Sequence, residues 1–388
     1  VLSTGGHEWP NWRRYLHQHP ELSNHEQKTA DYVAGVLQDL GGIEVKRPTS
    51  NSVLGVLRGA RPGRTVAFRA DLDALPVPEE TGLPFASVVP GVSHACGHDL
   101  HSAVLLGTAA TLARMRATLA GTVVFVFQPA EEVAPGGAQE LVASGALAGV
   151  EAFFGMHVFT GPPVGHVGIM PAGAASTAAD NFTLVIRGKG SHGAMPQRGV
   201  DPVVAGAAVV QALQTVVSRN VTPGEMAVVT VGRFQAGTAP NIIPDVAELS
   251  GTVRTVADST RRLAERRVRE IVDGVVKAHG ATYTLDYECG PPAIVNDPAL
   301  VDLARAAAVK AIGGEHVYDV PRMSASEDFA RYRDLAPICF LSLGAGPGPA
   351  NHSPFFDPDE GAMENGVKAQ VQILLDYLAA GPRGKAAR

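Results

Sequence analysis

Short apolar strand patterns alternate with helical patterns over the first part of the chain. Strands are predicted at 65–68, 122–127 and 152–154, where each apolar run is bounded by Gly, Pro or charged residues. A largely apolar helix is predicted at 102–115, between the first two strands. Strands that alternate with helices build a largely parallel sheet covered on both faces. The sequence therefore predicts an α/β fold with a mixed, mostly parallel sheet covered by helices.

The middle of the chain follows a more regular pattern. It predicts a strand, a helix, two strands, a helix and a strand, at 182–187, 201–218, 226–234, 246–254, 260–279 and 281–287. This β-α-β-β-α-β order is typical of a ferredoxin-like unit, which folds on its own. We therefore interpret 172–289 as an inserted α+β domain, and 1–171 with 290–388 as one discontinuous domain.

The composition excludes several classes of function. Lys and Arg number 32 against 38 Asp and Glu, so the formal charge is −6, and no basic patch is offered to a nucleic acid or an anionic membrane. No apolar run reaches the roughly 20 residues that span a bilayer, and no signal-peptide pattern opens the sequence. We therefore expect a cytoplasmic protein without a nucleic acid or membrane partner.

The densest group of chemically active side chains is the run His94-Ala-Cys96-Gly-His98-Asp99-Leu-His101, just before the predicted apolar helix. A thiolate and an imidazole two residues apart can bind one metal ion of intermediate softness, such as Zn, Mn, Co or Ni. Taken singly, a Cys or a His is more often a packing or surface residue. Five such groups in eight residues make a metal site the better interpretation.

Further metal-ligand side chains follow other predicted strands, where ligands bind in an open α/β sheet. They are Glu131 and Glu132, His157, His352 after a further predicted strand at 337–343, and the run Arg69-Ala-Asp71-Leu-Asp73. An isolated Glu-Glu pair is more often a solvated helix start. Here the pair is one of several groups of metal-ligand side chains expected at the same edge of one sheet, which we call the rim. A Cys, His and carboxylate set for two ions suits hydrolysis, because metals activate water and polarise a carbonyl. A spare carboxylate then transfers the protons.

The chain resembles the metal-dependent N-acyl-amino-acid amidohydrolases, which include hippurate hydrolase, aminoacylase-like enzymes and plant indole-acetyl-amino-acid hydrolases. The resemblance extends from about Trp12 to Tyr377. Its motifs occur in order as His94-Ala-Cys-Gly-His-Asp, Phe127-Gln-Pro-Ala-Glu-Glu132, Gly155-Met-His157, Gly188-Lys-Gly-Ser-His192-Gly-Ala-Met-Pro196, Asn241-Ile-Ile-Pro-Asp245, Gly251-Thr-Val-Arg254-Thr, Ser326-Glu-Asp-Phe329 and His352-Ser-Pro354.

The resemblance implies a zinc-exopeptidase-like catalytic domain that holds two divalent transition-metal ions. The implied ligands are Cys96, His98, Glu132, His157 and His352. Glu131 would be the general base. The inserted domain would be a lid that forms a homodimer or higher homo-oligomer, and its His192 would reach the partner's site to stabilise the tetrahedral intermediate. Asn241 and Arg254 would hold the substrate, although a strand-end salt bridge is an equal alternative for Arg254.

The implied reaction is hydrolysis of small N-acyl amino acids with an acetyl, benzoyl or indole-acetyl group. Dipeptidase, carboxypeptidase or N-carbamoyl-amino-acid hydrolase activity remains the catalytic alternative. A non-catalytic metal protein is disfavoured, because a structural site is usually closed by four ligands and has no spare base.

Three departures from the family pattern are expected around the substrate rim, at Asn351, Ser191 and 49–52. Of the three cysteines, Cys96 is the predicted ligand, while Cys289 and Cys339 are predicted to be packing residues.

Overall fold

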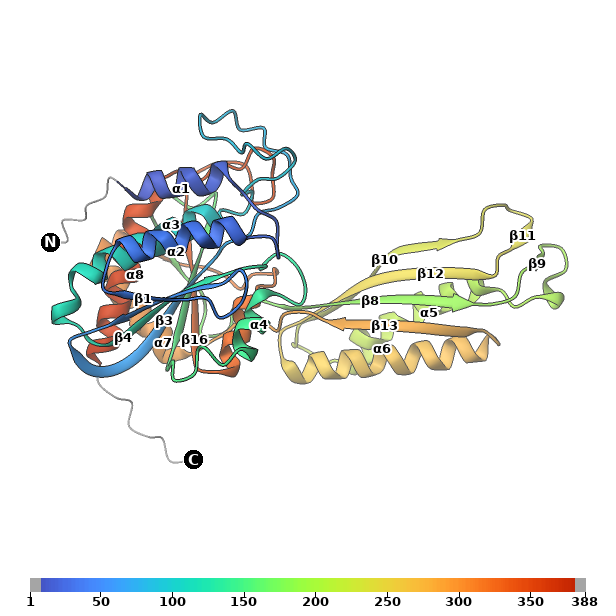
Figure 1. Cartoon of the computed structure of the whole chain (residues 1–388). Helices are drawn as coiled ribbons and strands as arrows, with labels where there is room; N and C mark the ends of the chain where they lie inside the picture. The colour runs from blue at the N-terminus through green and yellow to red at the C-terminus, as the bar shows by residue number, and fades with distance from the viewer. Residues whose placement is uncertain (1–7, 381–388) are drawn as a thin grey trace. The chain divides into compact units, whose positions relative to one another are not determined.

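The computed structural model describes residues 8–380, which form two compact units (Figure 1). The first comprises the described parts of Val1–Ala175 and Asp328–Arg388, together with Val295–Arg322. The second comprises Ser176–Ile294 and Met323–Glu327. The predicted insertion, 172–289, begins four residues before the second unit and ends five residues before Ile294. The start of the sequence, to which the signal-peptide expectation refers, lies outside the described residues.

The first unit is built on a central sheet whose path among the described residues is β1-β2-β4-β3-β5-β16-β14-β7. The bounds along this path are β1 (Ile43–Lys46), β2 (Val53–Arg58), β4 (Ala120–Gln128), β3 (Arg61–Asp71), β5 (Phe153–Phe159), β16 (Ile338–Gly344), β14 (Val295–Asn296) and β7 (Gly173–Ala174). Two short strands, β6 (Val167–Ile169) and β15 (Val317–Asp319), branch from β16. The central strands β4, β3, β5 and β16 pair in parallel, whereas β1, β2 and β7 pair antiparallel. This confirms the mixed, mostly parallel sheet.

Helices cover this sheet and supply most of its apolar partners. They are α1 (Trp9–Gln18), α2 (Gln27–Asp39), α3 (His98–Arg114), α4 (Gly137–Ala143), α7 (Pro298–Ile312) and α8 (Ala362–Ala379). The α3 helix is buried from His98 to Leu112, because its small and apolar residues face other helices as well as the sheet. The core therefore surrounds α3, and the start of this helix is fixed by packing on all sides.

The second unit has the β-α-β-β-α-β order that the sequence predicts. Its elements are β8 (Ala178–Arg187), α5 (Pro202–Thr215), β10 (Ala227–Ala236), β12 (Val246–Thr255), α6 (Asp258–Ala278) and β13 (Thr282–Cys289). The strands form an antiparallel sheet in the order β10-β12-β8-β13. A separate pair joins β9 (Ser191–His192) to β11 (Ile242–Ile243).

The two cysteines outside the predicted metal site differ in their surroundings. Cys339 is buried in the first core, as expected for a packing residue. Cys289 is exposed at the end of β13, so its assignment as a packing residue is wrong. In the described part of the chain, no helix has the length and apolar character needed to cross a membrane.

Candidate metal centre

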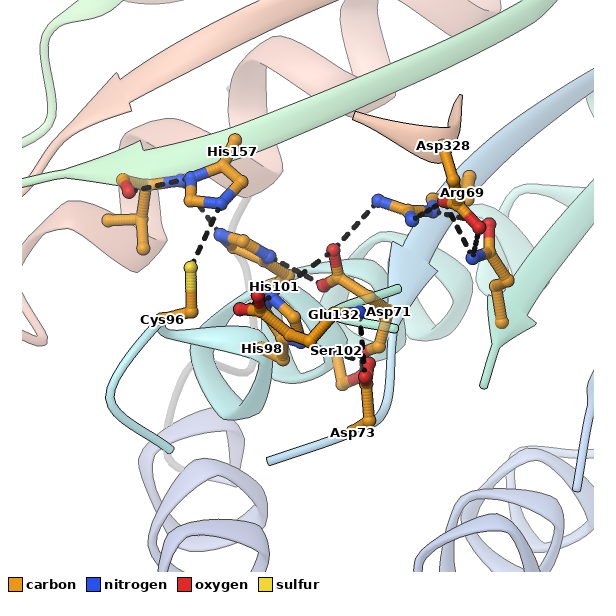
Figure 2. Close-up of polar contacts among 12 residues, drawn as sticks. Arg69, Asp71, Asp73, Cys96, His98, His101, Ser102, Glu132, His157 and Asp328 are labelled. Carbon is orange, nitrogen blue, oxygen red and sulfur yellow. Dashed lines mark hydrogen bonds and ion pairs between the residues drawn. The ribbon is translucent and has the colours of Figure 1, made fainter. Parts of the chain in front are cut away.

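The structure brings the five predicted ligands together in the first unit. The Sγ atom of Cys96 lies 3.4 Å from Nε2 of His157, and Figure 2 shows this sulfur directed at the imidazole. Oε1 of Glu132 lies 3.8 Å from Nε2 of His98 and 3.3 Å from Nε2 of His352. These side chains come from the turn before α3, from α3 itself, and from segments at or after β4, β5 and β16.

The predicted base belongs to the same cluster. Candidate ligand atoms of His98, Glu131 and Glu132 all lie within 4.8 Å of one another. The same holds for Cys96 with His98 and His157, and for Cys96 with Glu132 and His352. The cluster therefore contains more donor groups than one closed four-ligand site requires.

Two left-handed residues bring the ends of this cluster together. Gly97 has φ 84°, and a Cβ atom there would lie 2.4 Å from Cγ1 of Val158, so only glycine fits between Cys96 and His98. His352 has φ 70°, and its backbone N–H donates to the carbonyl of Ala95 over 2.7 Å. This hydrogen bond fixes His352 beside the Cys96 turn.

Hydrogen bonds orient the two buried imidazoles among the predicted ligands. Nδ1 of His98 lies 3.2 Å from Oδ1 of Asp73, and Nδ1 of His157 lies 2.8 Å from the carbonyl oxygen of Val158. Because Nδ1 is the donor in each pair, Nε2 is the atom presented to the cluster. Nε2 of His98 is buried and has no hydrogen-bond partner among the described residues. An orphaned nitrogen among sulfur and carboxylate donors fits a metal ion.

The electrostatics of the cluster also suit a divalent cation. Burial raises the pKa of the Cys96 thiol to about 12, whereas a metal ligand must be a thiolate. Burial and the neighbouring His101 lower the pKa of His157, which keeps its imidazole neutral. Burial opposes the charged form of His98, but Asp71, Asp73 and Cys96 together outweigh it and raise the pKa of this imidazole. The site therefore favours positive charge beside Asp71, which a bound cation would provide.

The predicted rim residues Asp71 and Asp73 lie behind the cluster and support it. Asp73 accepts from His98, from the backbone N–H of Glu132 over 3.0 Å and from the hydroxyl of Ser23 over 2.7 Å. Asp71 contacts Nδ1 of His101 at 2.6 Å and accepts from Arg69 over 2.7 Å. The sequence indicated these two carboxylates by their position at a strand end. The structure shows that they hold the imidazoles of His98 and His101 and the backbone of Glu132.

The predicted substrate residues belong to the second unit, so the ligand cluster is formed without them. His192 is exposed, and its Nδ1 accepts the N–H of Ala194 over 3.0 Å. Asn241 is exposed next to it, where its carbonyl accepts the N–H of Gly193 over 2.8 Å. Arg254 is half-buried and donates to two backbone carbonyls, at 3.4 and 3.5 Å, rather than to a carboxylate.

Two of the three departures lie in the scaffold of the site. Asn51 is buried and donates to Glu26 over 2.8 Å, so its expected place at a substrate rim is wrong. The side-chain amide of Asn351 donates to the carbonyls of Cys96 and Val158, at 3.3 and 3.2 Å. The sequence did not identify Glu26 as a residue of the site. It is a single glutamate near a helix start, and nothing in the sequence indicates its contact with the distant turn at Ala130.

A model of peptidase family M20/M25/M40 matches residues 67–376, which include every member of the cluster. The chain belongs to this family. The match confirms the family resemblance inferred from the motifs.

Several known proteins are similar to the chain over most of their length. The chain is 47% identical over 285 residues to the N-acyl-L-amino acid amidohydrolase of Geobacillus stearothermophilus, covering 74% of this chain and 77% of that protein. It is 40% identical over 355 residues to the N-acetylcysteine deacetylase of Bacillus subtilis (strain 168), covering 91% and 92%. The solved Bacillus subtilis YXEP protein, described as a dinuclear metal binding peptidase from M20 family, matches with a TM-score of 0.83 and 36% identity, covering 96% of this chain and 98% of that one.

Proposed function

We propose that the protein hydrolyses the amide bond of small N-acyl amino acids and releases a carboxylic acid and a free amino acid. The observation that carries this proposal is a carboxylate, Glu131, beside a cluster that already offers Cys, His and carboxylate donors. The names of the Geobacillus and Bacillus relatives support an acyl-amino acid substrate. The acyl group is proposed to be of the acetyl, benzoyl or indole-acetyl type.

Cys96, His98, Glu132, His157 and His352 are proposed to hold two divalent ions of Zn, Mn, Co or Ni. The YXEP protein is described as dinuclear, which supports the number. Such ions would lower the pKa of a water molecule and polarise the scissile carbonyl. Glu131 would take the proton of that water and deliver it to the leaving nitrogen. Glu132 would remain a ligand, since its neighbour provides the mobile carboxylate.

The cluster is exposed to solvent on the side of His352. The side chain of His352 is 54% exposed, that of Glu132 is 12% exposed, and His98 is buried. A substrate would therefore enter past His352 and place its amide carbon above Glu131 and Glu132. The buried His98 would exclude water from the inner end of the site.

The second unit is proposed to be a lid that forms a homodimer. His192 would stabilise the developing oxyanion in the partner's site, and Asn241 and Arg254 would bind the substrate carbonyl or carboxylate. The exposure of His192 and Asn241 supports contact with a ligand or a second subunit. A cytoplasmic location is also proposed, since all three cysteines are free.

A substrate screen tests this function. The purified protein would be loaded separately with Zn, Mn, Co or Ni and incubated with acetyl-, benzoyl- and indole-acetyl-amino acids, with dipeptides, and with N-carbamoyl-amino acids. We expect the highest kcat/KM on an acyl-amino acid. A higher kcat/KM on dipeptides or carbamoyl-amino acids would assign the alternative activity, and no turnover on any of them would refute the proposal.

A further inference from the structure

The turn that follows β4 carries Glu131 and Glu132 in a backbone conformation that needs support. Ala130, directly before Glu131, has φ 53°. A left-handed conformation is strained for an L-residue with a Cβ atom. Such residues persist where surrounding contacts hold them. The direction in which Glu131 leaves the strand therefore depends on what fixes Ala130.

A carboxylate from another part of the chain fixes it. Glu26 lies just before α2 and is completely buried. Its Oε1 atom accepts the backbone N–H of Ala130 over 2.7 Å and that of Asn24 over 2.9 Å. Its Oε2 atom accepts the side-chain amide of Asn51 over 2.8 Å. A buried carboxylate is tolerated when hydrogen bonds replace its water, and Glu26 has donors on both oxygens.

The other hydrogen bonds of the turn do not involve the backbone N–H of Ala130, which donates to Glu26. The carbonyl of Ala130 accepts the N–H of Gly137 over 3.0 Å, and the N–H of Glu132 donates to Asp73 over 3.0 Å. Glu26 and Asp73 thus bind the backbone on either side of Glu131. Asp73 also contacts the proposed ligand His98, whereas the carboxylate of Glu26 accepts hydrogen bonds from Asn24, Asn51 and Ala130, none of which is a proposed ligand.

We propose that Glu26 is a positioning residue that holds the Ala130 turn so that Glu131 is aimed at the reacting atoms. This inference rests on the proposed function of Glu131 as the general base. A misplacement of about 1 Å can cost on the order of 10²-fold in rate. Loss of the Glu26 acceptor should therefore lower kcat while leaving the ligand side chains in place.

The contact between Asn51 and Glu26 makes the conservative substitution Glu26→Gln an informative test. Its Oδ1 atom is buried and has no hydrogen-bond partner among the described residues. In Glu26→Gln, the new side-chain carbonyl can accept from Ala130 while the new NH2 group faces Asn51. Rotation of the Asn51 amide would then present Oδ1 to that NH2 group. Glu26→Gln can thus keep the contact with Ala130 at no loss of polar pairing.

The test compares Glu26→Ala, Glu26→Asp and Glu26→Gln in metal-loaded protein. We expect kcat to fall about 10- to 100-fold in Glu26→Ala, with KM and the bound metal unchanged. Glu26→Asp has a shorter side chain, which moves the acceptor oxygen away from the N–H of Ala130, so its loss of kcat should be intermediate. If Glu26→Ala does not fold, Glu26→Asp takes its place in the comparison. Glu26→Gln should restore kcat to near the wild-type value.

Glu21→Ala is the matched control. Glu21 accepts the backbone N–H and the hydroxyl of Thr29, at 2.8 and 3.0 Å, in the same α2 helix. Its loss removes two hydrogen bonds from that helix without touching Ala130, so kcat should be unchanged. An equal loss of kcat in Glu21→Ala would mean that Glu26 acts through helix stability only.

Amide hydrogen exchange gives a second readout that does not depend on activity. In metal-free protein, Glu26→Ala should accelerate exchange at Ala130, and Glu26→Gln should not. Unchanged exchange and unchanged kcat in Glu26→Ala would overturn the proposal, as would a kcat loss in Glu26→Gln equal to that in Glu26→Ala. If the wild-type protein turned over no substrate, the proposed function would fail, and the exchange data would still decide whether Glu26 holds the turn.

Discussion

Asp73 holds His98 by a contact of 3.2 Å between Oδ1 and Nδ1, and its other oxygen accepts the backbone N–H of Glu132. One carboxylate therefore orients two proposed ligands. We expect Asp73→Ala to weaken metal binding by about 10- to 100-fold, the usual effect of removing a residue that supports a ligand. Competition with a chromophoric chelator measures the change. Ser23→Ala removes another partner of Asp73 and should have a much smaller effect.

Glu131→Gln tests the proposal that Glu131 is the general base while the adjacent Glu132 is a metal ligand. The amide cannot take a proton from water, so kcat should fall about 10²- to 10⁴-fold. The proposed ligands are unchanged, so metal content should stay near the wild-type value. Elemental analysis and steady-state kinetics on the same preparation check both statements. Wild-type turnover in this variant would remove Glu131 from the mechanism.

Cys96→Ala should lower the bound metal, because it removes the thiolate from both Cys-containing donor groups. Elemental analysis after dialysis measures the stoichiometry. Cys339→Ala is the matched control, since Cys339 is also buried but lies in the apolar core. Equal metal content in the wild type and Cys96→Ala would contradict the ligand assignment.

Mixing inactive variants tests the proposed role of His192 across a dimer. If His192 acts in the partner's site, a heterodimer of Glu131→Gln and His192→Ala contains one complete site. Subunit exchange should therefore restore part of the wild-type activity, measured after co-incubation and reisolation. Absence of recovery, with exchange verified by mass spectrometry, would place His192 in its own subunit's site or outside the mechanism.

His17 is expected to make stability depend on pH. Its Nδ1 lies 2.9 Å from Asp99 and its Nε2 lies 3.1 Å from Glu79. Burial opposes the charged ring, but Asp99 and then Glu79 outweigh it and raise the pKa of His17 from 6.5 to about 9. The stabilisation is therefore complete below pH 6.5 and is lost as pH rises towards 9. A shift of this size corresponds to at most about 3 kcal/mol.

The thermal midpoint of metal-free protein measures this effect. The midpoint of the wild type should exceed that of His17→Gln by more at pH 6 than at pH 9.5. His279→Gln, at an exposed position after α6, is the control. A difference between wild type and His17→Gln that is the same at both pH values would contradict the charged state assigned to His17.

The sequence predicted the elements whose signal is local. The central strands β4 and β5 are apolar runs, and the second unit follows a regular period, so both were recognised. The edge strand β1 and its neighbour β2 were missed, because Ile43–Lys46 is very short and Gly55 interrupts the apolar run of Val53–Arg58. The predicted start of α3 was four residues late, since the polar metal-ligand run at His98 does not share the apolar pattern from which the helix was predicted.

The residues of the site also differ in whether a local sequence pattern reveals them. Cys96 and His98 were found because they are neighbours in sequence, and Glu132 and His157 because they follow strands. The contact of Glu26 with Ala130 spans 104 residues and joins a glutamate to a backbone N–H, which leaves no pattern in the sequence. Contacts of this kind depend on how the elements pack, so only the structure reveals them.

The position of β16 in the sheet has a consequence for biosynthesis. This strand pairs with β5 on one side and β14 on the other, yet it is made after the whole second unit. Until Ile338–Gly344 leaves the ribosome, the nascent first unit has an unpaired edge at β5, which can aggregate. The second unit, complete in sequence by then, can fold first. The β5 edge therefore has no β16 partner during the time in which some 180 residues, from Phe159 to Ile338, are synthesised.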